Sequence, residues 1–180
     1  NGPEQNAQTT YVGEGSVINV GSASGDGGQA VVWADGTTRY LGHIDGRASG
    51  KGAEVEVSGK EHLSFRGTVD LVGGEGKGTL LLDPQNIVIA TGGGDAVATN
   101  DQFAENPAGT STISPANLVT ALDGASVTLQ AHDDITVTNA VDASGNVVAG
   151  DLTLEAGDDV AINAAIDMKA GSSLSIIIDS

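Results

Sequence analysis

The sequence contains no cysteine, only 3% aromatic residues and few basic residues. The absence of cysteine excludes a secreted module held together by disulfides. No run of residues approaches the roughly 20 apolar positions that a membrane-spanning helix needs, so we expect no membrane insertion. Lys and Arg number 7 against 24 Asp and Glu, which gives a net charge of −17 at pH 7. Such an anionic surface repels phosphates, so nucleic acid is not an expected partner.

The chain has 180 residues, which fits a single domain. Its start, Asn-Gly-Pro-Glu, has neither the basic region nor the apolar stretch of a signal peptide, so we expect a mature product or a segment of a longer protein. The apolar residues are mostly Ala, Val, Ile and Leu, and 27 glycines supply turns. Disorder is not expected, because the β-branched and Leu residues recur in short, regular clusters.

A repeat of 25 residues is clearest near the C-terminus, where residues 127–142 recur at 152–167. Apolar residues match at each apolar position of the two copies, and the Asp residues match as well. A third copy begins at Leu174. The first half follows the same spacing, since residues 40–45 recur at 65–70. Self-similarity at a fixed period of this length is typical of solenoids.

Each repeat holds two or three short segments in which every second residue is apolar, separated by Gly-rich or Asp-rich corners. This period of two predicts β-strands with alternate side chains facing inward. Strands this short are not stable alone, so the units must stack and pair with one another. We therefore predict an all-β fold, a right-handed parallel β-helix (β-solenoid) of about six to seven coils of 24–25 residues.

The alternation also predicts which side chains face the interior, with like residues stacked on like from coil to coil. The predicted inward positions are Val31, Trp33, Val55, Val57, Leu80, Leu82, Val127, Leu129, Leu152 and Leu154. Tyr40 and Phe65 share one repeat position, which predicts an aromatic stack in or on the coil. We expect Trp33 and Phe65 in the core; an exposed aromatic ring would instead be free to stack on a sugar.

The repeat is lost near residues 92–124, which we interpret as an excursion from a single β-helix domain covering 1–180. N-terminal coils are expected over 8–90, the excursion over 91–125 and C-terminal coils over 126–180. Within the excursion, residues 115–123 predict a short helix. Ser114 is suited to cap it, Pro115 fits its first turn, and Gly124 ends it.

Three segments of the first half carry a family resemblance: residues 26–38, residues 54–60, and residues 78–84 with their Asp-Pro pair. They resemble filamentous-haemagglutinin-like exoproteins, the secreted partners of two-partner (type Vb) secretion in Gram-negative bacteria. The Leu-Thr-Leu-x-Ala-x-Asp-Asp units of the second half are also common in that family. The resemblance covers about residues 8–176.

The resemblance implies a secreted or cell-surface β-helix with a role in adhesion, aggregation or biofilm formation. It implies an outer-membrane two-partner-secretion transporter as partner of the parent protein, and it supplies no catalytic residue. We expect a rigid stalk and interaction surface, with polysaccharide, host glycan or another copy of the chain as further partners. Open strand edges at the coil ends favour such self-association.

Two Asp pairs, Asp133-Asp134 and Asp158-Asp159, lie 25 residues apart and would stack at about the 4.8 Å strand spacing. Like charges this close attract a cation, so the pairs are candidate Ca²⁺ ligands. The alternative is a turn position at which Asp accepts backbone N–H groups and faces water. No other cofactor is expected.

Two alternatives to an adhesin segment remain open. Some β-helices are polysaccharide lyases or glycosidases, which need paired carboxylates in a groove. The sequence contains neither G-x-S-x-G nor H-E-x-x-H, and we expect no enzyme. The second alternative is a purely structural spacer that binds nothing.

Overall fold

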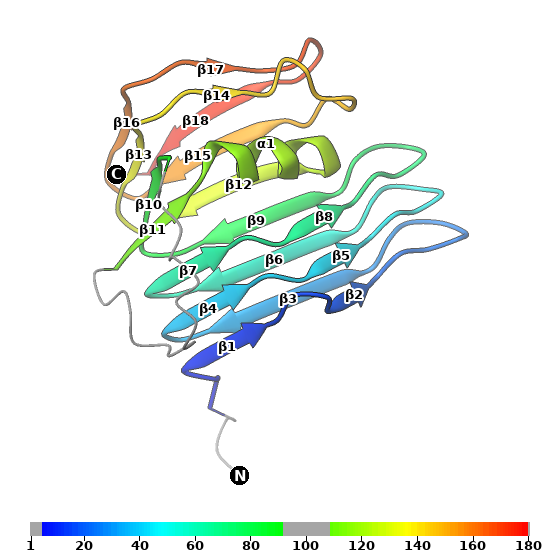
Figure 1. Cartoon of the computed structure of the whole chain (residues 1–180). Coiled ribbons are helices and arrows are strands. Elements are labelled where there is room, and N and C mark those ends of the chain that lie inside the picture. The colour runs from blue at the N-terminus through cyan, green and yellow to red at the C-terminus, as the bar shows by residue number, and fades with distance from the viewer. Residues whose placement is uncertain (1–4, 92–108, 180) are drawn as a thin grey trace.

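A computed structural model describes residues 5–91 and 109–179, and through them the chain winds as a parallel β-solenoid of about 6 turns (Figure 1). Short strands alternate with corners, and strands of successive turns pair in parallel. The predicted all-β solenoid with a single short helix is confirmed. No helix of these residues is long and apolar enough to cross a membrane.

The longest strands form one sheet, which we call face 1. Within the described ranges it has six strands in the order β18-β15-β12-β9-β6-β3. Their bounds are β3 (Gln29–Ala34), β6 (Glu54–Gly59), β9 (Thr79–Asp83), β12 (Ser126–Ala131), β15 (Leu152–Ala156) and β18 (Leu174–Ile178). Every second side chain of β12 and β15 is buried, as the pleat of a half-buried strand requires.

Two further sides complete each turn, and we call them face 2 and face 3. Face 2 comprises β1 (Thr9–Val12), β4 (Thr37–Tyr40) and β7 (His62–Phe65), followed by β11 (Thr110–Ile113), β10 (Asn86–Ile89), β13 (Ile135–Val137) and β16 (Val160–Ile162). Face 3 comprises β2 (Val17–Asn19), β5 (His43–Asp45) and β8 (Thr68–Asp70), then β14 (Val141–Asp142) and β17 (Ile166–Asp167).

One strand is inserted out of sequence order on face 2. β11 pairs in parallel with β10 and lies between it and β7. The backbone N–H of Leu63 donates to the Ser111 hydroxyl at 2.8 Å, so a side chain ties β7 to the inserted strand. Residues 92–108, which make up much of the predicted excursion, lie outside the described residues.

The helix α1 (Pro115–Gly124) takes the place of a face 3 strand between β8 and β14. Its bounds agree with the predicted 115–123 to within one residue. The Ser114 side chain accepts the N–H of Asn117 at the N-terminus, with Pro115 in the first turn as expected. At the other end, the Gly124 carbonyl accepts the N–H of Leu71 at 2.8 Å. This hydrogen bond ties the C-terminal end of the helix to the segment that follows β8.

The interior is a column of aliphatic layers. On face 1, Leu82 pairs with Leu129 and Leu129 with Leu154, and all three side chains are at most 1% exposed. The predicted aromatic stack lies inside the core: the rings of Tyr40 and Phe65 are 5.8 Å apart and 11° from parallel. An aromatic pair at this separation stabilises the layers by more than the burial of its apolar area alone would.

The prediction that Val31 and Trp33 face inward is wrong. Val31 is 66% exposed, Trp33 is half-buried on the outer surface, and their neighbours Val32 and Ala34 point into the core. Residues 30–34 are all apolar, so the alternation of apolar residues is compatible with either set of alternate side chains facing the core. A slip of one residue moves every side chain to the opposite face. The structure pairs Val32 with Val57, a spacing of 25, where the prediction used 24.

Candidate functional site

A groove of about 570 Å³ follows the corner at which the face 1 strands end and the chain turns toward face 2. We call it the corner groove. It is lined by Trp33, Lys60, Glu61, Asp83, Pro84, Gln85, Gln130, Ala131, His132, Glu155, Ala156, Gly157 and Asp179. These residues come from successive turns of the solenoid, so the groove extends along the solenoid axis rather than around it.

The floor of the groove follows from strand register. The last outward positions of β3, β6, β9, β12 and β15 stack in one line, which we call the outer row: Trp33, Ser58, Asp83, Gln130 and Glu155. Neighbouring strands are about 4.8 Å apart, so the members of this row follow one another at that spacing, and all but the fully buried Ser58 line the groove. The amide of Gln130 donates to Glu155 Oε1 at 3.3 Å, which links two members of the row. A regular line of polar groups suits an extended, repetitive ligand.

Asp83 lies in the middle of this row and is half-buried. Its pKa is raised above the usual 3.8, chiefly because burial removes water from the carboxylate. The negative charge of Glu56 and, to a smaller extent, that of Glu155 raise the pKa further, while His132 lowers it. The charged form of Asp83 is therefore less favourable in the folded protein than in the unfolded chain.

We expect the Asp83→Asn variant to be more stable than the unmodified protein at pH 7. A carboxyl group whose pKa is higher in the folded than in the unfolded chain destabilises the fold wherever it is charged. This destabilisation decreases as the pH falls through the pKa of the folded state, and it disappears below the pKa of the unfolded state. The advantage of the variant should therefore shrink as the pH approaches 3.8. Urea denaturation at several pH values measures this. A variant that is less stable at pH 7 would contradict the assignment.

Trp33 lies at the N-terminal end of the outer row. Its indole Nε1 donates to Asp35 Oδ1 at 3.2 Å, which fixes the ring near the surface. Hydrogen bonds from Asn6 and then from Trp33 lower the pKa of Asp35, so this carboxylate stays charged. The half-buried ring offers a flat apolar surface beside polar groups, the combination with which proteins stack against sugar rings.

The residue between Trp33 and Asp83 is Ser58. It is fully buried, and its hydroxyl has no hydrogen-bond partner in the described structure. Its backbone carbonyl accepts the Thr38 hydroxyl at 2.6 Å, so the main chain is satisfied while the side chain is not. A buried hydroxyl without a partner is unfavourable by about 1–3 kcal/mol, and Ser58 itself does not line the groove.

The Asp pairs proposed as Ca²⁺ ligands occupy a neighbouring corner position. Asp133 Oδ2 accepts the side-chain amide of Asn86 at 3.3 Å, and Asp134 Oδ1 accepts the backbone N–H of Asp159 at 3.2 Å. Asp134, Asp158 and Asp159 are exposed. These are the hydrogen bonds expected of turn positions. In the described ranges, no group of three or more His, Cys, Asp or Glu is placed to hold a metal ion, and Ca²⁺ binding stays a prediction.

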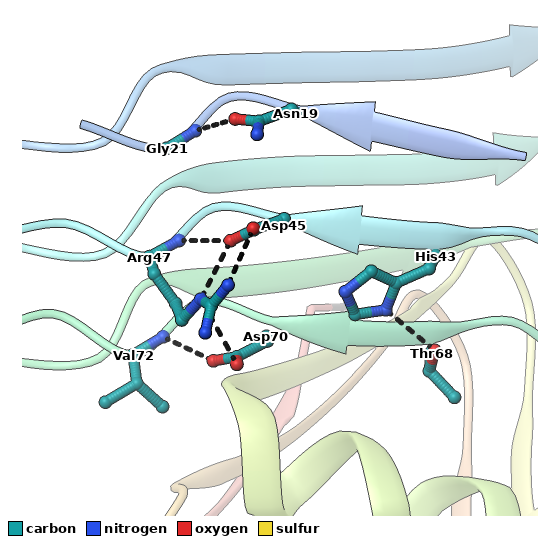
Figure 2. A network of polar contacts seen from close by, with 8 residues as sticks. All are labelled: Asn19, Gly21, His43, Asp45, Arg47, Thr68, Asp70 and Val72. Atoms are coloured by element: carbon teal, nitrogen blue, oxygen red, sulfur yellow. Dashed lines mark hydrogen bonds and ion pairs between the residues drawn. The ribbon is translucent and has the colours of Figure 1, made fainter. Parts of the chain in front are cut away.

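A second polar cluster lies on face 3 (Figure 2). Asn19, Asp45 and Asp70 end successive strands, and each accepts the backbone N–H two residues further on, at 3.0, 3.3 and 3.4 Å. Arg47 bridges two of them, with Nη2 2.9 Å from Asp45 Oδ2 and Nε 3.5 Å from Asp70 Oδ2. Its side chain is 63% exposed. This cluster closes the turns that follow β2, β5 and β8.

Sequence reasoning did not find the corner groove. The row Trp33, Ser58 and Asp83 follows the 25-residue period and could have been aligned from the repeat. This alignment did not point to a surface row because Trp33 was predicted to face the core. The remaining lining residues come from corners of unlike sequence, which only the folded chain brings together.

Comparison with known proteins identifies no relative, since neither a protein-family model nor a curated protein matches this sequence. The fold itself defines the class of protein, a parallel β-solenoid repeat protein.

Proposed function

We propose that this chain is a segment of a secreted bacterial surface adhesin that binds an extended polysaccharide in the corner groove. The observation that carries the proposal is the outer row, in which Trp33 and polar side chains repeat along the axis at the strand spacing. A long ligand lying along this line makes many weak contacts at once, and their combined strength exceeds that of any one contact. The stacked turns supply the rigidity that a stalk requires.

The cellular setting is the part of the proposal that rests on the family resemblance. The segments around Trp33 and Asp83-Pro84 resemble filamentous-haemagglutinin-like exoproteins. We therefore propose location at the bacterial surface or in the secreted fraction, and a two-partner-secretion transporter as partner of the parent protein. The absence of cysteine is compatible with passage of an unfolded chain through a narrow pore.

Replacement of Trp33 by Ala tests the binding proposal. Aromatic anchors in partly closed sites commonly contribute about 1.4 kcal/mol or more to the free energy of binding. We therefore expect the variant to bind a polysaccharide, which the unmodified chain binds, roughly tenfold more weakly. Binding is measured by calorimetry after a glycan array has selected the polymer. Tyr11→Ala is the matched control, because Tyr11 is 46% exposed and lies outside the groove. Failure of every polysaccharide to bind would favour a structural spacer.

A glycoside hydrolase is a second candidate, favoured by the raised pKa of Asp83 within a groove. Asp83 would act as general acid and Glu155 as general base. They stand two strands apart, at about 9.5 Å between their backbones, and inverting enzymes hold their carboxyl groups about 6.5–9.5 Å apart. Release of reducing ends from a bound polymer, lost in Asp83→Asn, would support this activity. Binding without cleavage would contradict the hydrolase candidate and leave the adhesin proposal standing.

We include a second copy of the chain among the proposed partners. Leu174, Ile176 and Ile178 of β18 occupy positions that pair with buried residues of β15, yet they are 39%, 48% and 51% exposed. At the opposite end of face 1, β3 is the outermost strand of the sheet in the described residues. Stacking one end on the other would continue the parallel sheet. Sedimentation should show a molecular mass that rises with concentration, and a constant monomer mass would contradict self-association.

A further inference from the structure

We propose that the corner groove selects a polysaccharide that carries free amino groups, such as a deacetylated hexosamine polymer, over neutral or anionic polysaccharides. This inference rests on the proposed function, because it names the ligand class of the same groove. Three observations support it: the charges that line the groove, their spacing, and the apolar ring of Trp33 beside them.

The groove carries more negative than positive groups. Its lining holds four carboxylates and one lysine, together with His132; the carboxylates are Glu61, Asp83, Glu155 and Asp179, and the lysine is Lys60. Glu56 adds a further negative charge near Asp83. An arriving ammonium group relieves the repulsion between these carboxylates, whereas a uronate or sulfate group adds to it. The net charge of −17 on the whole chain attracts cations and repels anions in the same way.

The carboxylates are spread along the solenoid axis rather than gathered at one point. Glu61 lies at the corner after β6, Asp83 ends β9, and Glu155 lies on β15. Asp179 follows β18. At about 4.8 Å per strand, the row meets an extended chain at several successive units. A single metal ion would need ligands that converge, and this arrangement does not converge on one point in the described residues.

The groove also has features that a simple polyamine would not use. Trp33 lines the groove and presents a half-buried ring at one end of the outer row. A sugar unit carries an apolar ring face that can stack on this ring. Trp33 therefore favours an amino-sugar polymer over a basic peptide, which would engage only the carboxylates.

The test compares four probes on the unmodified chain by calorimetry at low and at high salt. The probes are a glucosamine oligomer, an N-acetylglucosamine oligomer of the same length, a galacturonate oligomer and polylysine. We expect the glucosamine oligomer to bind at least about tenfold more tightly than its acetylated form at low salt, with a smaller difference at high salt. Glu155→Gln should weaken this binding. Asp167→Asn, an exposed carboxylate on face 3, is the matched control and should not.

Each other result overturns the inference in a distinguishable way. Equal binding of the acetylated oligomer, with loss in Trp33→Ala, would refute amine selection and leave the proposed function intact. Equal binding of polylysine, unaffected by Trp33→Ala, would show that the groove recognises charge alone. Preference for galacturonate would reverse the electrostatic argument. No binding of any oligosaccharide would refute the proposed function together with this inference.

Discussion

Replacing Leu129 by Ala should lower the free energy of unfolding by about 2–5 kcal/mol. Leu129 is fully buried, and its backbone lies between those of Leu82 and Leu154 in the central layer of face 1. Truncation removes apolar contacts and leaves a cavity that the neighbouring turns cannot close, because their strands are held in register by backbone hydrogen bonds. Urea denaturation followed by circular dichroism measures the change.

Thr128→Ala is the control for this prediction. Thr128 precedes Leu129 on the same strand but faces outward and is only half-buried. Its replacement should change the free energy of unfolding by less than about 1 kcal/mol. Equal losses at Thr128 and Leu129 would show that this strand does not have the inward and outward faces described.

Replacing Gly52 by Ala should also destabilise the fold, for a different reason. A Cβ atom at this position would lie 1.7 Å from the Leu71 carbonyl oxygen and 2.4 Å from the Gly78 nitrogen. Both are backbone atoms of an adjoining corner, so neither can move aside as a flexible side chain would. Overpacking of this kind typically destabilises by about 1–3 kcal/mol, and more where the obstacle is backbone. We expect a lower melting temperature and a smaller yield of soluble protein.

Gly145→Ala is the matched control for the corner substitution. A Cβ atom there would meet nothing within 4 Å, and Gly145 is exposed in a turn. The melting temperature of this variant should stay close to that of the unmodified protein. A Gly52→Ala protein that melts as high as Gly145→Ala would contradict the close approach of adjacent turns at this corner.

The repetitive part of the fold could be predicted from the sequence because its signals are local or periodic. The 25-residue spacing determines which strands pair, as the register of Leu129 with Leu154 shows. The helix was predictable because Ser114, Pro115 and Gly124 mark its ends. The common repeat position of Tyr40 and Phe65 predicted their stacking.

The rest depends on interactions that the repeat does not encode. The five apolar residues 30–34 left the phase of β3 undetermined, and the wrong choice placed Trp33 in the core. The insertion of β11 next to β7 was missed because residues 110–113 are mostly polar and match no repeat unit. The corner groove was missed because its lining joins corners from different turns whose sequences differ.

The central claim is that the corner groove binds an extended polysaccharide, and Trp33 is the one tryptophan of the chain. Its fluorescence therefore reports on the groove without any label. We would titrate the unmodified protein with the glucosamine oligomer and follow the emission of Trp33. The account predicts a saturable change in emission whose midpoint matches the affinity from calorimetry. Binding that leaves the emission of Trp33 unchanged would place the ligand elsewhere and contradict the claim.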